Sequence, residues 1–204
     1  MRKLKYSPLN IVVCGIGGQG NVLASELAAS ALTDLGYRVA VAETYGASQR
    51  GGSVMSHVRV SETEDLGVLI PSGEAHIIVG FEPLEALRIA RKYAGKETVA
   101  VYDPRPIFPP SVLKGDKIYP SIEEISKEMD ELCIKTVQVP ATDIAMDAGN
   151  SKVANIVLLG ALCGLDSSPL LPEELEAVLK QRFTGTVLDM NLNAFRLGYN
   201  NVVK

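Results

Sequence analysis

Two glycine-rich stretches carry the residues whose types and spacing are best suited to chemistry. The first contains Gly15, Gly17 and Gly20 in the spacing G-x-G-x-x-G and directly follows a short apolar run. Glycines in this spacing allow a tight turn, after which an exposed helix N-terminus can face a pyrophosphate. The spacing by itself therefore indicates a dinucleotide site, and a tight turn required only by packing is the alternative.

The second stretch covers residues 44–53 and contains Gly46, Arg50 and the consecutive pair Gly51-Gly52. Consecutive glycines permit positive φ angles, and successive N–H groups in such a turn can form a nest that binds an anion. Arg50 adds a guanidinium that can donate two hydrogen bonds to one anionic group. We expect the two stretches to meet at the carboxyl edge of a sheet, where open α/β sheets usually carry their sites.

An NAD site also requires an acidic residue at the end of the second strand, to hold the ribose hydroxyls. Glu43 lies in that region and follows Gly20 at close to the expected spacing of about 20 residues. A free-standing NAD- or FAD-dependent oxidoreductase is therefore one hypothesis. Such an enzyme would need a catalytic acid or base beside a substrate pocket, and the sequence shows none that is recognisable.

Hydrophobic periodicity predicts the elements that position these stretches. Glu82 and Glu85 lie in the first turn of one expected helix, where acidic side chains favour the helix dipole. A strand over 54–61 is expected to pair antiparallel with a short strand near 66–70. The other strands are expected over 10–14, 37–43, 75–81, 98–102 and 134–139, and the helices over 21–35, 83–93, 121–131, 141–148, 152–163, 172–182 and 186–197.

This order of elements predicts the fold class. It is typical of an α/β, Rossmann-like, three-layer fold with a mixed, mainly parallel sheet and a helical C-terminal third from about residue 141. With 204 residues, of which 47% are hydrophobic and 22% charged, the chain has an ordinary globular composition. We therefore assign residues 1–204 to a single domain.

Charge and hydropathy argue against several classes of partner. The net charge is -4, and the basic residues are not concentrated in one block, so we expect neither nucleic acid nor a membrane surface as a partner. The apolar run before the first glycines is shorter than a signal peptide requires, and no window approaches the length of a membrane span. We expect a cytoplasmic protein.

Few residues are available as metal ligands. The three cysteines, Cys14, Cys133 and Cys163, stand far apart, and the chain has only two histidines, His57 and His76. An odd number of separated cysteines argues against a disulfide framework, and an iron–sulfur cubane within the chain needs four thiolates. We therefore expect no metal site in this chain.

Three stretches together resemble one known family: GIGGQGNVLAS, ETYGASQRGGSVMSHVRV and LIPSGEAHIIVGFEPLEALR. They are similar to the gamma-type subunit of 2-oxoacid:ferredoxin oxidoreductases, above all to the branch formed by the small beta subunit of indolepyruvate:ferredoxin oxidoreductase. The similarity extends from about residue 10 to residue 197. The resemblance implies a non-catalytic but required subunit of a complex of anaerobic metabolism, which oxidatively decarboxylates a 2-oxoacid, such as an arylpyruvate, to an acyl-CoA.

The resemblance also implies where the cofactors lie. A larger catalytic subunit would hold thiamine diphosphate, magnesium and the iron–sulfur clusters, and the complex would use coenzyme A and pass electrons to ferredoxin. This chain has neither the G-D-G motif of thiamine folds with its following asparagine nor the cluster cysteines. Carried onto this sequence, the residues implied to contact coenzyme A or the catalytic subunit are Gly15, Gly17, Gly18, Gln19, Gly20, Ser48, Gln49, Arg50, Gly51 and Gly52.

The substrate and the ligand stay open at this point. The indolepyruvate branch tends to have histidine where this chain has Tyr45, whereas 2-oxoglutarate-like gamma chains tend to have Ser-Tyr-Gly there. A gamma subunit specific for 2-oxoglutarate or another ketoacid is therefore an alternative. A scaffold that binds no ligand is a further hypothesis.

Overall fold

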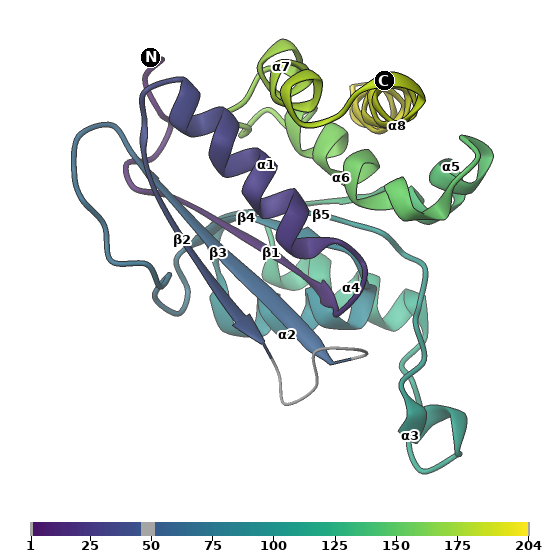
Figure 1. The fold of residues 1–204 in the computed structure, drawn as a ribbon. Helices are drawn as coiled ribbons and strands as arrows, with labels where there is room; N and C mark the ends of the chain where they lie inside the picture. Colours follow the sequence, from purple (N-terminus) through teal and green to yellow (C-terminus); the bar gives the residue numbers. More distant parts are fainter. Residues whose placement is uncertain (1, 46–51, 204) are drawn as a thin grey trace.

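The computed structural model describes residues 2–45 and 52–203 (Figure 1). Its sheet has six strands in the order β2-β3-β1-β4-β5-β6. The strands are β1 (Leu9–Ile16), β2 (Arg38–Tyr45), β3 (Ser53–Ser61), β4 (Ala75–Gly80), β5 (Ala94–Tyr102) and β6 (Lys135–Gln138). The helices are α1 (Asn21–Asp34), α2 (Pro83–Tyr93), α3 (Pro110–Leu113), α4 (Ile122–Leu132), α5 (Ala141–Asp147), α6 (Ala154–Cys163), α7 (Pro172–Arg182) and α8 (Gly185–Val202), with a 3-10 turn (Ser151–Val153) before α6.

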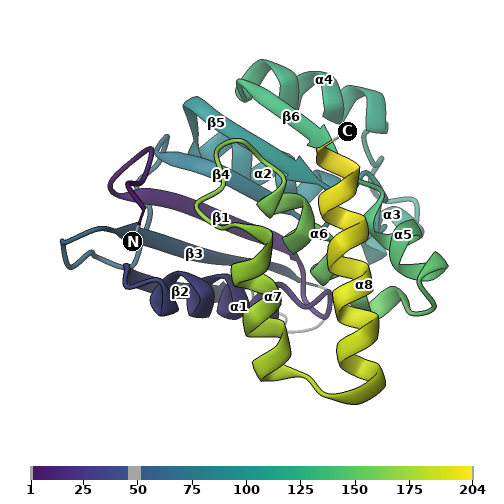
Figure 2. The ribbon, with the colours of Figure 1, turned by 90° about the horizontal axis from the view of Figure 1, so that it is seen from above.

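The sheet is mixed and mainly parallel. Strands β1, β4, β5 and β6 run parallel to one another, whereas β3 pairs antiparallel with both β1 and β2. Helices cover both faces: α1, α6, α7 and α8 lie on one side, and α2 and α4 lie on the other (Figures 1 and 2). The predicted three-layer α/β fold with a helical C-terminal part is confirmed.

The expected pairing of the 54–61 strand with a short strand near 66–70 is wrong. β3 lies between β1 and β2, with Val58 opposite both Ile11 and Val41, so neither edge of β3 is left for a further strand. Within the described ranges, residues 66–70 form no strand. They are held instead by side chains of β3, because Arg59 Nη1 donates to the Gly67 carbonyl at 2.8 Å and His57 Nδ1 accepts from the Ile70 N–H at 3.2 Å.

The core is divided by the sheet into two apolar layers. On the α1 side, Ile11, Val13 and Val79 pack with α1 and the C-terminal helices. On the α2 side, Val12, Cys14 and Ile78 pack with α2 and α4. Alternate residues of β1 therefore enter opposite layers, as the pleat of a strand buried on both faces requires.

Helix α6 is buried along almost its whole length between the sheet and α8. It crosses α8 where Gly160 and Gly198 meet: a Cβ on Gly160 would lie 1.9 Å from the Phe195 carbonyl oxygen, and a Cβ on Gly198 1.9 Å from that of Val157. Only glycine fits at these two positions. The close contact of these two glycines fixes how α6 and α8 pack against each other on this face of the sheet.

Candidate functional site at the carboxyl edge of the sheet

The first glycine stretch forms the turn from β1 into α1. Gly18 and Gly20 adopt left-handed backbone conformations, with φ of 107° and 85°. Gly20 is the N-cap residue of α1 and provides no capping side chain, so the first N–H groups of the helix face the edge of the sheet. Gly15, inside β1, has no room for a side chain because a Cβ would lie 2.7 Å from Gln19 Oε1 and 2.9 Å from Phe81 Cβ.

Gln19 braces this turn from within. Its Oε1 accepts a hydrogen bond from the Ile16 N–H at 2.7 Å, and its Nε2 donates to the Phe81 carbonyl at 2.7 Å. The amide therefore joins the end of β1 to the end of β4. A second brace comes from α6, because Asn155 Nδ2 donates to the Gly20 carbonyl at 3.4 Å. Both ends of the Gln19 amide are occupied inside the fold, although the sequence implied a contact with a ligand or the partner.

The described end of the second glycine stretch meets the first turn at the carboxyl edge of the sheet. The Gly17 N–H donates to the Gly52 carbonyl at 2.8 Å, which places the residue before β3 against the first turn. Four of the predicted site residues, Ser48, Gln49, Arg50 and Gly51, lie outside the described residues.

A crevice of about 450 Å³ opens beside the first turn. Among the described side chains that line it, Lys152 carries the only positive charge. Besides Gly18, Gln19 and Gly20 of the turn, the lining residues are Leu23, Phe81, Asp103, Ile107, Thr142, Ser151, Lys152, Ala154, Asn155 and Leu158. Lys152 and the N-terminus of α1 favour an anionic group in this crevice, whereas the Asp103 carboxylate, which accepts from two backbone N–H groups, opposes it.

Sequence reasoning missed Asp103, Thr142 and Lys152. Asp103 directly follows β5 and is buried, and its carboxylate accepts from the Thr142 N–H at 2.8 Å and the Arg105 N–H at 3.0 Å. Burial raises the pKa of Asp103, which its hydrogen bonds partly oppose. The carboxylate thus ties β5 to the start of α5. The available signal for Asp103 and Thr142 was position, since they follow strands that end at the same edge, whereas Lys152 lies in the 3-10 turn after α5 and had no such signal.

Glu82 follows β4 at the same edge and is buried. Its carboxylate caps α2 by accepting from the Glu85 N–H at 2.8 Å, and it also accepts from the Ile107 N–H at 3.3 Å and from the Tyr119 hydroxyl. Burial raises the pKa of Glu82, while these three hydrogen bonds favour its ionised form. The predicted role of Glu82 at the helix start is confirmed, and its second role is to hold the segment after β5.

The position of Glu43 argues against the NAD hypothesis. Glu43 lies opposite Ser56 of β3, and Ser56 lies opposite Val13 of β1. With β3 inserted, Glu43 is separated from β1 by two strand spacings, roughly 10 Å. In the register of the sheet, Glu43 is aligned with Val13 in the middle of β1 and not with the turn that follows Ile16. A Rossmann site needs this acid next to the first glycine turn.

The described residues show no group of three or more His, Cys, Asp or Glu side chains arranged to hold a metal ion. All three cysteines are free and buried. Burial raises the pKa of the Cys14 and Cys163 thiols, and it raises that of Cys133 to about 11. No helix in the described ranges is long and apolar enough to cross a membrane.

Fold and site together define an α/β unit with a braced glycine turn beside an open crevice. The chain belongs to the pyruvate ferredoxin/flavodoxin oxidoreductase family, which it matches over residues 10–201. Indolepyruvate oxidoreductase subunit IorB of Archaeoglobus fulgidus is 40% identical to it over 195 residues, which are 96% of each chain.

Two solved structures share the fold. The pyruvate oxidoreductase subunit PORC of Thermotoga maritima superposes with a TM-score of 0.72 at 22% identity, covering 96% of this chain and 97% of its own. The 2-oxoglutarate:ferredoxin oxidoreductase of Magnetococcus marinus, solved with 2-oxoglutarate, coenzyme A and succinyl-CoA bound, superposes with a TM-score of 0.71 at 25% identity. That match covers 97% of this chain but 31% of the other, so there the fold is one part of a longer polypeptide.

Proposed function

We propose that this chain is the small, non-catalytic but required subunit of an indolepyruvate-type 2-oxoacid:ferredoxin oxidoreductase. The complex would oxidatively decarboxylate an arylpyruvate to an acyl-CoA and pass the electrons to ferredoxin. The observation that carries this proposal is the 40% identity to an IorB subunit over 96% of both chains. A match over nearly the full length of both proteins supports the role of a separate subunit.

The proposed division of labour assigns the redox and thiamine chemistry to a larger partner subunit. Thiamine diphosphate, magnesium and iron–sulfur clusters would be bound there. In support, the described residues include no cluster of metal-ligating side chains, and the three cysteines are buried at separate places in two core layers. An iron–sulfur cubane needs thiolates that converge on one site.

The first glycine turn would contribute to the coenzyme A site. Coenzyme A is a polyanion, and the crevice offers the N-terminus of α1 together with the Lys152 ammonium. Because the Gln19 amide is bonded within the fold, Gly18 and Gly20 would act through their backbone N–H groups rather than through a side chain. The chain would thereby bind and orient the phosphate end of the acyl acceptor.

The complex itself provides the test. The tagged chain would be isolated anaerobically from its native cells, and viologen reduction would be assayed with coenzyme A and with indolepyruvate, a branched-chain 2-oxoacid, pyruvate or 2-oxoglutarate. We expect a larger subunit to co-purify and indolepyruvate to give the highest kcat/KM. Turnover by the chain alone, or its recovery without any oxidoreductase subunit, would contradict the proposal. A preference for 2-oxoglutarate would instead identify the alternative ketoacid specificity.

The role of the crevice is tested by Lys152→Ala in the assembled complex. We expect the KM for coenzyme A to rise about 10-fold with little change in kcat, because one phosphate contact is lost. Lys127→Ala, an exposed lysine of α4 on the opposite face, is the matched control and should leave the KM unchanged. Equal KM values in the two variants would remove Lys152 from the site and favour a scaffold without a ligand.

A further inference from the structure

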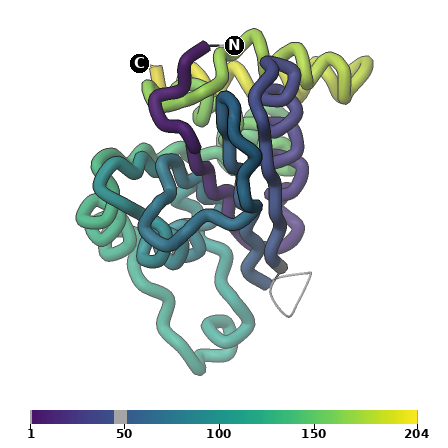
Figure 3. Tube along the Cα trace, turned by 90° about the vertical axis from the view of Figure 1, so that its left-hand side faces the viewer, coloured from purple at the N-terminus to yellow at the C-terminus, as the bar shows by residue number. Residues whose placement is uncertain are grey.

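The segment between β5 and α4 leaves the body of the molecule as a projecting arm, residues 104–120, with α3 near its tip (Figures 1 and 3). The tip is closed by its own hydrogen bonds, from the Asp116 N–H to the Ser111 carbonyl and from the Gly115 N–H to the Val112 carbonyl, both at 2.9 Å. No residue of α3 is buried. The arm has a defined shape without a core of its own.

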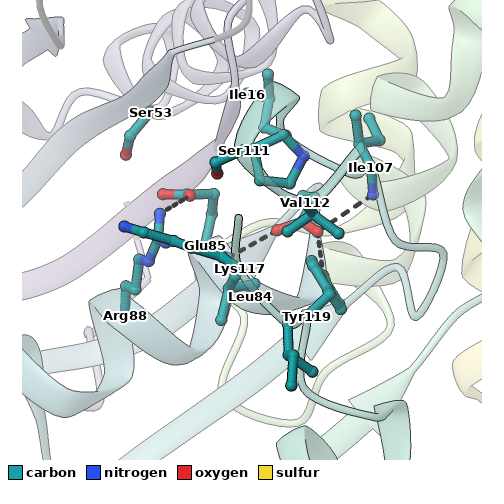
Figure 4. Close-up of a pocket in the computed structure, with 13 residues that line it drawn as sticks. Ile16, Ser53, Leu84, Glu85, Arg88, Ile107, Ser111, Val112, Lys117 and Tyr119 are labelled. Atoms are coloured by element: carbon teal, nitrogen blue, oxygen red, sulfur yellow. Dashed lines mark hydrogen bonds and ion pairs between the residues drawn. The ribbon is translucent and has the colours of Figure 1, made fainter. Parts of the chain in front are cut away.

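The neck of the arm is fixed to the body by Glu82. The Ile107 N–H and the Tyr119 hydroxyl, from the two sides of the arm, both donate to Oε1 of this buried carboxylate (Figure 4). Phe108 and Tyr119 add an edge-to-face ring contact, with 5.2 Å between the centroids. Five prolines, at 104, 106, 109, 110 and 120, further restrict the backbone. Little conformational entropy is left to lose when such an arm binds a partner.

Four apolar side chains are exposed on this rigid arm. The exposed fractions are 41% for Ile107, 46% for Phe108, 72% for Leu113 and 96% for Ile118. Exposed apolar side chains are normal when they are scattered, but four on one short segment mark an interaction surface. Leu113 and Ile118 contribute almost nothing to the core of this chain, so the fold alone gives no reason for them.

We propose that the arm is the docking element of this chain and inserts into an apolar recess of the larger catalytic subunit, an inference that rests on the proposed function. Ile107 lines both the crevice at the glycine turn and the cleft of about 190 Å³ beneath the arm. A partner that completes the crevice therefore meets the arm. In the Magnetococcus marinus protein the same fold occupies 31% of a longer chain, so the remainder of that oxidoreductase is tethered to it.

The charge of the arm indicates which charge the rim of the partner's recess should carry. The chain as a whole has a net charge of -4, yet residues 104–120 contain three basic residues, Arg105, Lys114 and Lys117, and one acid, Asp116. Arg105 is paired with Asp143 of α5, so the two lysines carry the charge that the arm presents. Lys114 and Lys117 lie next to Leu113 and Ile118 in the chain and are exposed. The matching recess is an apolar pocket with an acidic rim, since complementary charge at a rim guides association while apolar burial provides the affinity.

The test measures binding to the larger subunit and stability of the isolated chain for an arm variant and a control variant. The larger subunit that co-purifies with the wild-type chain is titrated with the wild-type chain, with a chain carrying Leu113→Asp and Ile118→Asp, and with Leu69→Asp as control. Leu69 is 57% exposed in the loop between β3 and β4, away from the arm. Urea unfolding of each isolated chain checks that the exposed substitutions leave the fold intact.

We expect the arm variant to bind at least about 100-fold more weakly, with unchanged unfolding, and the Leu69→Asp control to bind like the wild type. Equal binding by the arm variant would overturn the docking role while leaving the proposed function standing. If no larger subunit binds the wild-type chain at all, the proposed function fails and the docking role fails with it. An arm-dependent dimer of the isolated chain, with normal binding of the larger subunit by the arm variant, would assign the arm to a second copy instead.

Discussion

The first glycine turn and the arm leave the same edge of the sheet but are built in opposite ways. In the turn, polar side chains are directed inward: the Gln19 amide joins β1 to β4, and Asn155 reaches the Gly20 carbonyl from α6. In the arm, the neck is held by Glu82 of the body and by Arg105, whose guanidinium donates to Asp143 of α5 at 2.9 Å, and the apolar side chains of the tip are exposed. Substitutions in the turn should therefore disturb folding, whereas substitutions at the tip of the arm should disturb assembly.

Among substitutions in the turn and the arm, Gly15→Ala should give the largest loss of stability. The new methyl group would lie under 3.0 Å from Gln19 Oε1, Asn21 Oδ1 and Phe81 Cβ, so the brace of the turn has to move. We expect the free energy of unfolding to fall by about 3 kcal/mol or more, measured by urea denaturation. Gly67→Ala is the control, because its nearest neighbour would be Arg59 Nη1 at 3.9 Å, and it should change little. Equal stability of both variants would show that the turn is not tightly packed.

Gln19→Ala should have an intermediate effect. It leaves the Ile16 N–H and the Phe81 carbonyl without the partners that Gln19 provides, and we expect a loss of about 2 kcal/mol in the isolated chain. Gln181→Ala, an exposed glutamine of α7, is the control and should be neutral. If Gln19 served only a ligand or partner, the isolated Gln19→Ala chain would unfold like the wild type.

Tyr119→Phe should have the smallest effect, about 1 kcal/mol at neutral pH, because it removes one of three donors to the Glu82 carboxylate. Since burial raises the pKa of Glu82, the contribution of this group to stability is complete below its usual pKa and is lost as the pH rises through the raised value. Removing the hydroxyl raises that pKa further. The penalty should therefore be largest at neutral pH and shrink as acid protonates Glu82.

The matched control for this prediction is Tyr6→Phe, whose hydroxyl donates to the exposed Glu97 at 3.2 Å. We expect it to have no measurable effect at any pH, because exposed hydrogen bonds exchange readily with water. Urea unfolding of both variants from pH 4.5 to 7.5 provides the measurement. A Tyr119→Phe penalty that is constant over this range would mean that Glu82 does not titrate in response to the hydroxyl.

Local patterns in the sequence predict most of the fold, and contacts between distant residues account for what they miss. The 83–93 helix is found at its predicted bounds because Pro83 and the acidic residues around it mark a helix start. The position of β3 between β1 and β2 could not be predicted from periodicity, because an alternating pattern indicates a strand but not which strands pair with it.

The sequence predicted the glycines of the candidate site, but not the side-chain hydrogen bonds that hold the turn and the arm in place. The spacing of Gly15, Gly17 and Gly20 indicated a turn at the edge, and the hydrogen bond from Gly17 to Gly52 shows that the described end of the second stretch meets this turn. That Gln19 reaches the Phe81 carbonyl, or that Glu82 holds both sides of a distant arm, depends on the tertiary arrangement of separate strands. A role for the loop residues in binding coenzyme A or the partner stays a prediction.

The buried cysteines have a consequence for how this protein withstands oxidants. Oxidation and alkylation proceed through the thiolate, and burial raises the pKa of Cys14, Cys133 and Cys163 while shielding their sulfur atoms. The native chain should therefore react slowly with peroxide or iodoacetamide until it unfolds. Exposure to air should therefore leave the three thiols of the folded subunit unmodified, which mass spectrometry of the air-exposed chain would check.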